Sequence, residues 1–466
     1  FYDLMVRLTA QIDKFIDPAT GNWVTIREKA YQYDQKGNVI EEQDPLGVEG
    51  KYGTIYTYNL ANKVVSVLDP VSQERGLLFT KQYTYDGLER KTSETDANRV
   101  ITNYTLDDAG NIIQQSVIKN LSATPEIVKS TTYDLAGNTL SVTDGNLNTT
   151  TFKYNALGKV RVEIDPGDAT VPQNTITNQY DVMGNLISSL NSMGKKIIYT
   201  YDNQGRQTSK TEEKSDGTQA IVTSVKYDKN GNKCFVTDGN GNITSNTYDE
   251  LNRVVAKSIT VSGVKETSTN TYDANGNKLT DTDWRGNTTT YKYDPINRLL
   301  EKDDAYNLPI EKLTYNDNSS QITSTDALGN VTQFVYDDNN RLTTTTDPAG
   351  NKTSKCYDNV GNVSSKVDGK GNATTYVYDE FNRLISVKDP LGEVTSYTYD
   401  LNGNMLTKTD GNGNTTTFEY NAINKPVRKI DQGRRTGNSE IYVYNPAKTE
   451  SYTYFIDGNT ATMTDR

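Results

Sequence analysis

The chain has 466 residues and a net charge of −11, and it contains no histidine. The acidic balance argues against nucleic acid as a partner, because phosphate binding needs clustered Lys and Arg. The absence of histidine removes Ser-His-Asp and Cys-His nucleophilic sites and histidine-based zinc sites, so no enzymatic activity and no cofactor are expected.

A tyrosine that is usually followed by aspartate returns along the whole chain. Its early registers are Tyr2, Tyr33, Tyr58, Tyr85, Leu106 and Tyr133. Leu106 replaces the tyrosine at one register and is recognised by the Asp-Ala-Gly-Asn that ends at Asn111. Internal repetition of this kind predicts a repeat array, in which insertions map to surface loops. We expect mobile loops at Pro166–Pro172 and Glu212–Gly217.

The spacing becomes more regular toward the C-terminal end. Residues 1–132 hold irregular repeats with insertions, residues 133–292 hold repeats of 21–26 residues, and residues 293–466 hold the most regular 21-residue repeats. Gly-Asn and Asn-Arg endings alternate after successive Tyr-Asp pairs, which makes the true period about 42 residues. We therefore predict a single continuous array over 1–466.

Each repeat carries the signals of two strands and two turns. The segment Thr374-x-Tyr376-x-Tyr378 alternates with period two, as in a half-buried strand. Asp410-Gly-Asn-Gly-Asn414 is typical of a turn, because Gly and Asn accept positive φ and Asp caps its own turn. Helix signals are absent. The sequence predicts an all-β fold of tandem antiparallel hairpins forming a long curling or spiralling sheet, part of a hollow shell or tube.

The repeat tyrosines are expected to form the packed face of this sheet. Adjacent hairpins should bring equivalent tyrosines together as cross-strand aromatic pairs. At Lys355 a lysine takes the aromatic position, so that repeat should be locally weaker. The structural tyrosines of the regular repeats are Tyr248, Tyr272, Tyr291, Tyr293, Tyr336, Tyr357, Tyr376, Tyr378, Tyr397, Tyr399 and Tyr420.

Two glycine-rich turns place oxygen atoms at alternate positions, as the start of a calcium loop does. They comprise Asp238, Asn240 and Asn242, and Asp410, Asn412 and Asn414. The glycine required at the sixth position is missing, since Ile243 stands there, and ordinary turn chemistry explains the pattern better. Thermal melting that is insensitive to a chelator would exclude calcium.

The repeat text resembles the YD-repeat, or Rhs-repeat, family. Tyr272-Asp-Ala-Asn-Gly-Asn277 and Tyr399-Asp-Leu-Asn-Gly-Asn404 match its Tyr-Asp-x-x-Gly-Asn element closely. Members include bacterial Rhs and wall-associated proteins, shell subunits of insecticidal toxin complexes, and teneurins. The resemblance implies a hollow β-shell, which in toxins encloses a toxic domain. The self-cleaving closing segment of such toxins is not recognisable here.

Three functions remain open at this point. The first is a non-enzymatic wall of an extracellular or cell-surface shell or tube that encapsulates a polypeptide cargo, such as a toxin, or serves as a scaffold. The resemblance implies a bacterial origin. The second is an adhesive, glycan-binding surface module. The third is a self-assembling filament, because sheet edges are open for pairing. The partners would be other repeats, cargo, glycans or further copies, without membrane insertion.

Overall fold

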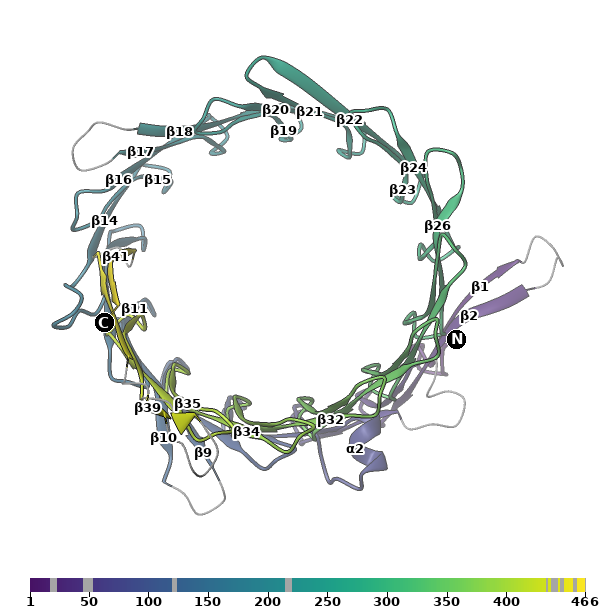
Figure 1. Cartoon of the computed structure of the whole chain (residues 1–466), viewed down its shortest axis with the longest axis horizontal. Helices are drawn as coiled ribbons and strands as arrows, with labels where there is room; N and C mark the ends of the chain where they lie inside the picture. The colour runs from purple at the N-terminus through teal and green to yellow at the C-terminus, as the bar shows by residue number, and fades with distance from the viewer. Residues whose placement is uncertain are drawn as a thin grey trace. The chain divides into compact units, whose positions relative to one another are not determined.

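The computed structural model describes residues 1–16, 23–44, 53–119, 124–213, 220–432, 435–436, 443–444, 448–455 and 459–465. Within these ranges the chain forms one 39-stranded antiparallel sheet, with a separate pair of short strands (Figure 1). The predicted all-β fold with a long curled sheet of hairpins is confirmed. No helix in the described part of the chain has the length and apolar character needed to cross a membrane.

The strands follow one another at short intervals. The first are β1 (Ala10–Ile16), β2 (Trp23–Tyr33), β3 (Val39–Gln43), β4 (Thr54–Tyr58), β5 (Val64–Leu68), β6 (Lys81–Tyr85), β7 (Lys91–Asp96), β8 (Ile101–Leu106), β9 (Ile112–Ile118) and β10 (Glu126–Tyr133). Next come β11 (Thr139–Asp144), β12 (Thr149–Tyr154), β13 (Val160–Ile164), β14 (Thr175–Tyr180), β15 (Leu186–Leu190), β16 (Lys196–Tyr201), β17 (Gln207–Glu213), β18 (Ala220–Tyr227), β19 (Lys233–Thr237) and β20 (Ile243–Tyr248). These are followed by β21 (Val254–Val261), β22 (Val264–Tyr272), β23 (Lys278–Thr282), β24 (Thr288–Tyr293), β25 (Leu299–Asp303), β26 (Pro309–Tyr315), β27 (Gln321–Asp326), β28 (Val331–Tyr336), β29 (Leu342–Thr346) and β30 (Lys352–Tyr357). The last are β31 (Val363–Val367), β32 (Ala373–Tyr378), β33 (Leu384–Lys388), β34 (Val394–Tyr399), β35 (Met405–Thr409), β36 (Thr415–Tyr420), β37 (Pro426–Asp431), β38 (Arg435–Thr436), β39 (Val443–Tyr444), β40 (Lys448–Tyr454) and β41 (Thr460–Asp465).

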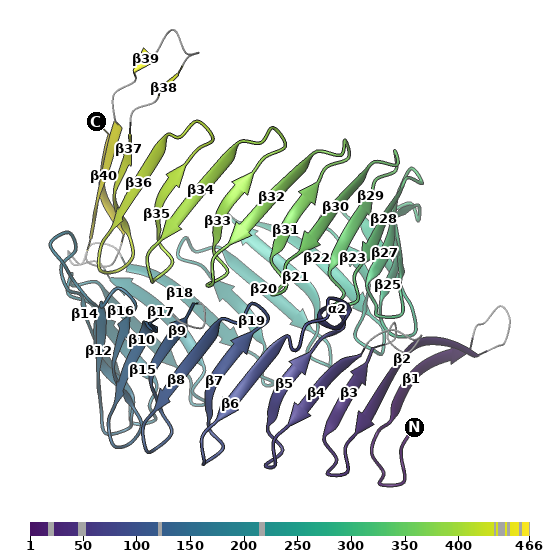
Figure 2. The same ribbon diagram turned by 90° about the horizontal axis from the view of Figure 1, so that it is seen from below.

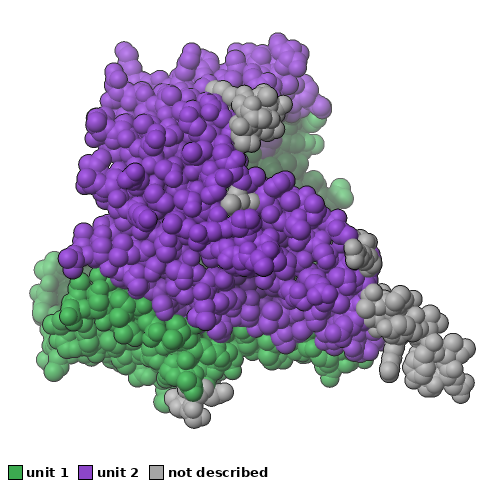
Figure 3. Space-filling view, turned by 90° about the vertical axis from the view of Figure 1, so that its left-hand side faces the viewer, with its two compact units in different colours: residues 1–127, 291–396 green, residues 128–290, 397–466 purple. Residues whose placement is uncertain are grey.

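The chain divides into two compact units, and each unit contains two separate segments. Unit 1 comprises Phe1–Ile127 and Tyr291–Ser396, and unit 2 comprises Val128–Thr290 and Tyr397–Arg466 (Figure 3). Each unit thus joins an earlier and a later stretch of the same repeat array.

The hairpin of β32 and β33 illustrates the repeat. Tyr376 lies opposite Val387, and the register shifts by one residue at Tyr378, which pairs with Leu384. The same shift recurs before the strand-end residue of other repeats, including Leu106 opposite Ile112. It is a β-bulge, in which two residues of one strand face one residue of its neighbour. Leu106 therefore occupies the tyrosine register, as the sequence predicts.

The expected cross-strand tyrosine pairs are not found between adjacent strands in the described part of the sheet. Each repeat contributes two strands, so a strand rich in Val, Leu, Thr or Ser separates one tyrosine-bearing strand from the next. Phe334 faces Thr345 and Tyr376 faces Val387, for example. In other hairpins the residue opposite the ring is charged, as Glu94 is opposite Tyr83.

One short helix, α2 (Pro70–Glu74), corrects the expectation that helix signals are absent. The side chain of Asp69 caps its first turn by accepting a hydrogen bond from the amide of Ser72, and Pro70 stands at the first helical position. An Asp N-cap followed by proline is a favourable helix start. This signal was present in the sequence, but it was hidden by the general abundance of Asp-Pro turns.

Burial is shallow and spread along the chain. Fully buried hydrophobic side chains are few among the described residues, and Val171 is the most buried at 1% exposure. The residue before the strand-end tyrosine is often exposed, as at Val335 and Val377, which are 54% and 52% exposed. The sheet therefore depends on many half-buried contacts and on its turns, and much less on a thick apolar core.

Candidate functional site

Both kinds of turn in the repeat share one hydrogen-bonding scheme. After Tyr378, Oδ1 of Asp379 accepts hydrogen bonds from the amides of Phe381 and Arg383, each at 2.9 Å. Asn382 has a positive φ of 59°. The other type of turn, after β29, places Asp347 and Gly350 in the corresponding positions, with a φ of 84° at the glycine. We call the first type the YD turn and the second the DG turn.

Consecutive YD turns are linked to each other, and the link explains the two-repeat period. Asn362, at the end of a Gly-Asn turn, donates from Nδ2 to Oδ1 of Asn382 in the following Asn-Arg turn, at 2.9 Å. In the opposite phase, Arg341 ends an Asn-Arg turn, donates from Nε to Asp337 at 2.8 Å and stacks over the ring of Tyr357 at 4.6 Å. Amide contacts and arginine stacking thus alternate along the array.

The strand-end tyrosines tie each hairpin to the preceding one. Tyr357 donates its hydroxyl to the carbonyl of Leu342 at 2.8 Å, and Tyr336 and Tyr378 make the equivalent bond. Burial raises the pKa of these three tyrosines, so their hydroxyls stay protonated and able to donate. The eleven repeat tyrosines predicted from the sequence are all half-buried at or near strand ends.

Within unit 1, DG-type edges of the earlier segment meet YD turns of the later segment. Asn318 donates to Asp44 at 2.7 Å, across 274 residues of chain. The guanidinium of Arg75, beside α2, donates to Oδ1 of Asn359 at 2.9 Å and to the carbonyl of Tyr357 at 2.8 Å. Figure 2 shows α2 near the ends of β30 and β31, whose connecting turn contains Asn359. We call this row of contacts the seam of unit 1.

Unit 2 has a seam of the same kind. Asn402 donates to Oδ2 of Asp144 at 2.6 Å, and Asn146 donates to Oδ2 of Asp400 at 2.8 Å. The two turns therefore exchange reciprocal amide-to-carboxylate bonds across 258 and 254 residues. A DG turn again faces a YD turn. In both units the later segment therefore uses the same edge of the repeat to contact the earlier one.

The insertion Pro166–Pro172 takes part in the unit 2 seam, although a mobile surface loop was expected there. Val171 within it is almost completely buried, and Oδ2 of Asp168 accepts a hydrogen bond from the amide of Ala422 at 2.6 Å. The insertion is packed because it fills the seam. Of the second predicted loop, Glu212–Gly217, residues 214–217 lie outside the described residues.

Sequence reasoning missed the seams, since no local pattern states which distant turns will meet. The only hint was that Asp and Asn occur at turn positions where local capping does not use every donor and acceptor. Chemically the seams offer neutral and charged hydrogen bonds at the edges of the sheet. Their hydrogen bonds attach one row of hairpins to another within each unit.

The candidate calcium turns are closed by their own hydrogen bonds. Oδ1 of Asp238 accepts from the amides of Asn240 and Asn242, and Oδ2 accepts from the side chain of Asn242, all at 2.9 Å. Asp410 makes the equivalent bonds with Asn412 and Asn414. No group of three acidic or thiol ligands gathers among the described residues. That these residues serve as ordinary turns rather than as a calcium site stays a prediction.

The chain repeats one hairpin pattern. Tyr, Arg and Asn side chains link neighbouring hairpins, and the seams join distant turns within each unit. These features define a structural β-repeat protein. The family model described as RHS Repeat matches residues 315–352, 357–394, 378–415 and 399–436. Residues 315–352 and 357–436 therefore carry Rhs repeats, and the predicted resemblance to the YD/Rhs-repeat family is confirmed. No curated protein matches the chain in sequence.

Solved structures share the fold over nearly the whole chain. The crystal structure of TcdB2-TccC3 is similar with a TM-score of 0.68 at 15% identity, over 98% of this chain and 29% of that chain. A form of TcdB2-TccC3 without its hypervariable C-terminal region gives a TM-score of 0.61 at 15% identity, over 100% of this chain and 28% of that chain. The Tc holotoxin pore of Photorhabdus luminescens gives a TM-score of 0.61 at 16% identity, over 100% of this chain and 26% of that chain. This chain thus spans less than a third of the length of each of these three solved chains.

Proposed function

We propose that this chain is a wall segment of an extracellular β-shell that encloses a polypeptide. The observation that carries the proposal is the seam, at which turns 254 to 284 residues apart bond to each other within each unit. A sheet that bonds to itself edge to edge grows in height as well as in length, which is the property that a wall needs. A separate filament-forming strand edge or a single adhesive face would not require it.

The fold shared with TcdB2-TccC3 supports the same proposal, because that similarity covers 98% of this chain. The proposed role is non-enzymatic, since the repeat residues are engaged in turns and inter-hairpin bonds. The proposed location outside the cell rests on the resemblance to toxin-complex proteins. Within the proposal, the array 1–466 acts as one continuous element whose partners are further repeats and an enclosed polypeptide.

Electron microscopy of the purified protein, imaged fresh and after dilution, tests this function. Hollow, size-limited particles or curved wall fragments are the expected result. Long uniform tubes or fibres that lengthen with concentration would contradict enclosure and make polymerisation the function. A glycan array provides a parallel test of the adhesive alternative. We expect no sugar to bind, because the aromatic rings are packed within the repeats.

A further inference from the structure

Two lysines face each other on neighbouring strands of unit 1. Lys355 on β30 lies directly opposite Lys366 on β31. Like charges at directly opposed positions destabilise a strand pair unless a counter-charge lies close by. Neither lysine forms an ion pair with a carboxylate of the described residues, and Lys366 instead places its ammonium 5.5 Å from the ring centre of Tyr376. The pair therefore carries an uncompensated positive charge.

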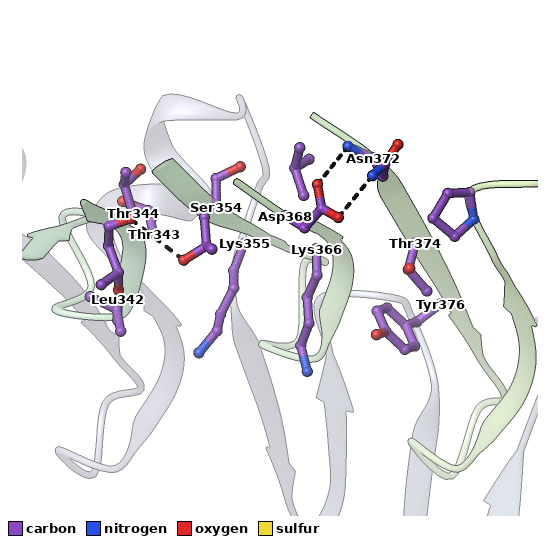
Figure 4. A pocket seen from close by; sticks show the side chains of 14 residues that line it. Leu342, Thr343, Thr344, Ser354, Lys355, Lys366, Asp368, Asn372, Thr374 and Tyr376 are labelled. Carbon is purple, nitrogen blue, oxygen red and sulfur yellow. Dashed lines mark hydrogen bonds between the residues drawn. The ribbon is translucent and has the colours of Figure 1, made fainter. Parts of the chain in front are cut away.

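The acidic side chain that directly follows β31, Asp368, is already occupied. Oδ1 of Asp368 accepts hydrogen bonds from the amides of Lys370 and Asn372, and Oδ2 accepts one from the side chain of Asn372, each at 2.9 Å. Figure 4 shows Lys355 and Lys366 extending side by side, away from Asp368 and toward the side of the sheet on which Tyr376 lies. Asp368 thus serves its own turn and leaves the lysines unbalanced.

Two lysines at the equivalent position of other repeats pair with a carboxylate. Lys210 lies opposite Tyr199 and bonds to Glu212, and Lys429 lies opposite Phe418 with its ammonium 3.2 Å from Glu450.

Elsewhere on this side of the sheet, one carboxylate is shared by two lysines. Glu94, opposite Tyr83, lies 2.9 Å from Lys81 and 3.1 Å from Lys91. Burial alone would raise the pKa of Glu94, but the hydrogen bonds from the two lysines outweigh it and the pKa is lowered. The Lys355–Lys366 pair has the two cations of such a triad without the carboxylate.

A cavity of about 360 Å³ opens at the same place. It exists because Lys355 stands where the neighbouring hairpins carry Phe334 and Tyr376, so a ring is missing from the row. Its lining also includes the hydroxyl-bearing Thr345 and Thr353. The lining spans β29 to β32, which is about 14 Å at a strand spacing of roughly 4.8 Å and accommodates about four residues of extended peptide.

We propose that this cavity binds a glutamate or aspartate side chain of an extended acidic peptide, with the carboxylate held between the ammonium groups of Lys355 and Lys366. The carboxylate completes the arrangement that Glu94 forms with Lys81 and Lys91. The threonine hydroxyls donate to and accept from the peptide backbone, and the Tyr376 ring covers the aliphatic part of the acidic side chain. The site does not depend on enclosure, because an open wall fragment presents it equally.

Fluorescence anisotropy with two labelled peptides tests the site on the full chain. The probes are Ser-Thr-Glu-Thr-Ser and the matched Ser-Thr-Gln-Thr-Ser. The glutamate peptide is expected to bind at least tenfold more tightly, and the double substitution Lys355→Thr with Lys366→Thr should abolish the difference. The control is Lys408→Thr on β35, which removes a lysine from the position equivalent to Lys366 outside the cavity and should leave binding unchanged.

A second variant, Lys355→Phe, restores the missing ring and fills the cavity. It should lose peptide binding while melting at the same or a higher temperature, which separates loss of the site from loss of the fold. Equal affinity for the two peptides, or unchanged binding in either cavity variant, would overturn the proposal. Displacement of the peptide by an equimolar amount of citrate would show that the site recognises free carboxylates alone, and would contradict a peptide site.

Discussion

The turn aspartates are the residues on which each hairpin depends most directly. In the DG turn, Asp347 accepts from the amide of Asn351 at 2.8 Å and from its side chain at 2.8 Å. The hydrogen bond from the Asn351 side chain is the largest cause that lowers the pKa of Asp347. The same cause lowers the pKa of other turn aspartates, namely Asp134, Asp181, Asp228 and Asp326. Ionisation of the carboxylate therefore strengthens the cap at these turns.

These shifts predict acid lability. A carboxyl group whose pKa is lower in the folded state stabilises the fold above its unfolded pKa of about 3.9, and this contribution is lost as the pH falls through the folded value. The melting temperature should be flat from pH 7 to about 5 and fall steeply below about pH 4. Differential scanning calorimetry across pH 2.5 to 7 measures it. A melting temperature that is constant down to pH 2.5 would contradict the role of the carboxylates.

At the scale of the element, the pair of hairpins is the natural unit. A Gly-Asn turn bonds forward through an asparagine amide, as Asn362 does to Asn382, whereas an Asn-Arg turn reaches forward through its guanidinium. The alternation was visible in the sequence, but its cause was not, because a spacing does not state which side chain contacts the next ring. For the same reason, the sequence did not reveal that the strand-end tyrosines bond to backbone carbonyls of the preceding hairpin. It suggested contacts between tyrosines instead.

Removing one forward-reaching arginine should loosen one hairpin junction. Arg341→Gln loses the ion pair with Asp337 and the stacking on Tyr357, at a cost of about 1 kcal/mol. Hydrogen exchange should accelerate at the amides of β29 and β30 and remain unchanged in distant repeats. Arg285→Gln is the control, because that exposed guanidinium stacks on the exposed Trp284 of its own turn. Equal effects of the two substitutions would contradict the junction role.

At the scale of the whole molecule, the seams bring distant segments of the chain together within each unit. Gly145 in the DG turn after β11 lies close to the opposite turn, since a Cβ at this position would lie 2.7 Å from Cβ of Leu401. Side-chain atoms cannot come so close, so the seam of unit 2 requires glycine here. Gly87 holds the corresponding position of a YD turn, where an added Cβ would meet nothing within 4 Å.

These two glycines make a matched test of the seam. Gly145→Ala should accelerate hydrogen exchange at the amides of residues 400–404, because the turns are forced apart. Gly87→Ala should leave those amides unchanged and stabilise its own hairpin by roughly 0.5 kcal/mol, through the reduced freedom of the unfolded chain. Unchanged exchange at residues 400–404 in Gly145→Ala would show that the seam does not constrain these turns.

The sequence by itself determined the strands, the turns, the positions of the repeat tyrosines and the all-β fold. It did so because these features arise from interactions within about 20 residues, such as Asp capping its own turn and alternation along a strand. The sequence also showed that Lys355 occupies an aromatic position of the repeat, and this substitution opens the cavity.

The tertiary structure alone decided which turns meet. The seam partners lie 254 to 284 residues apart, and their meeting depends on small twists summed over many hairpins and on insertions such as Pro166–Pro172 and α2. No single repeat encodes that sum. The opposition of Lys355 and Lys366 likewise required the register between two strands, which a one-residue bulge sets and which sequence spacing does not reveal.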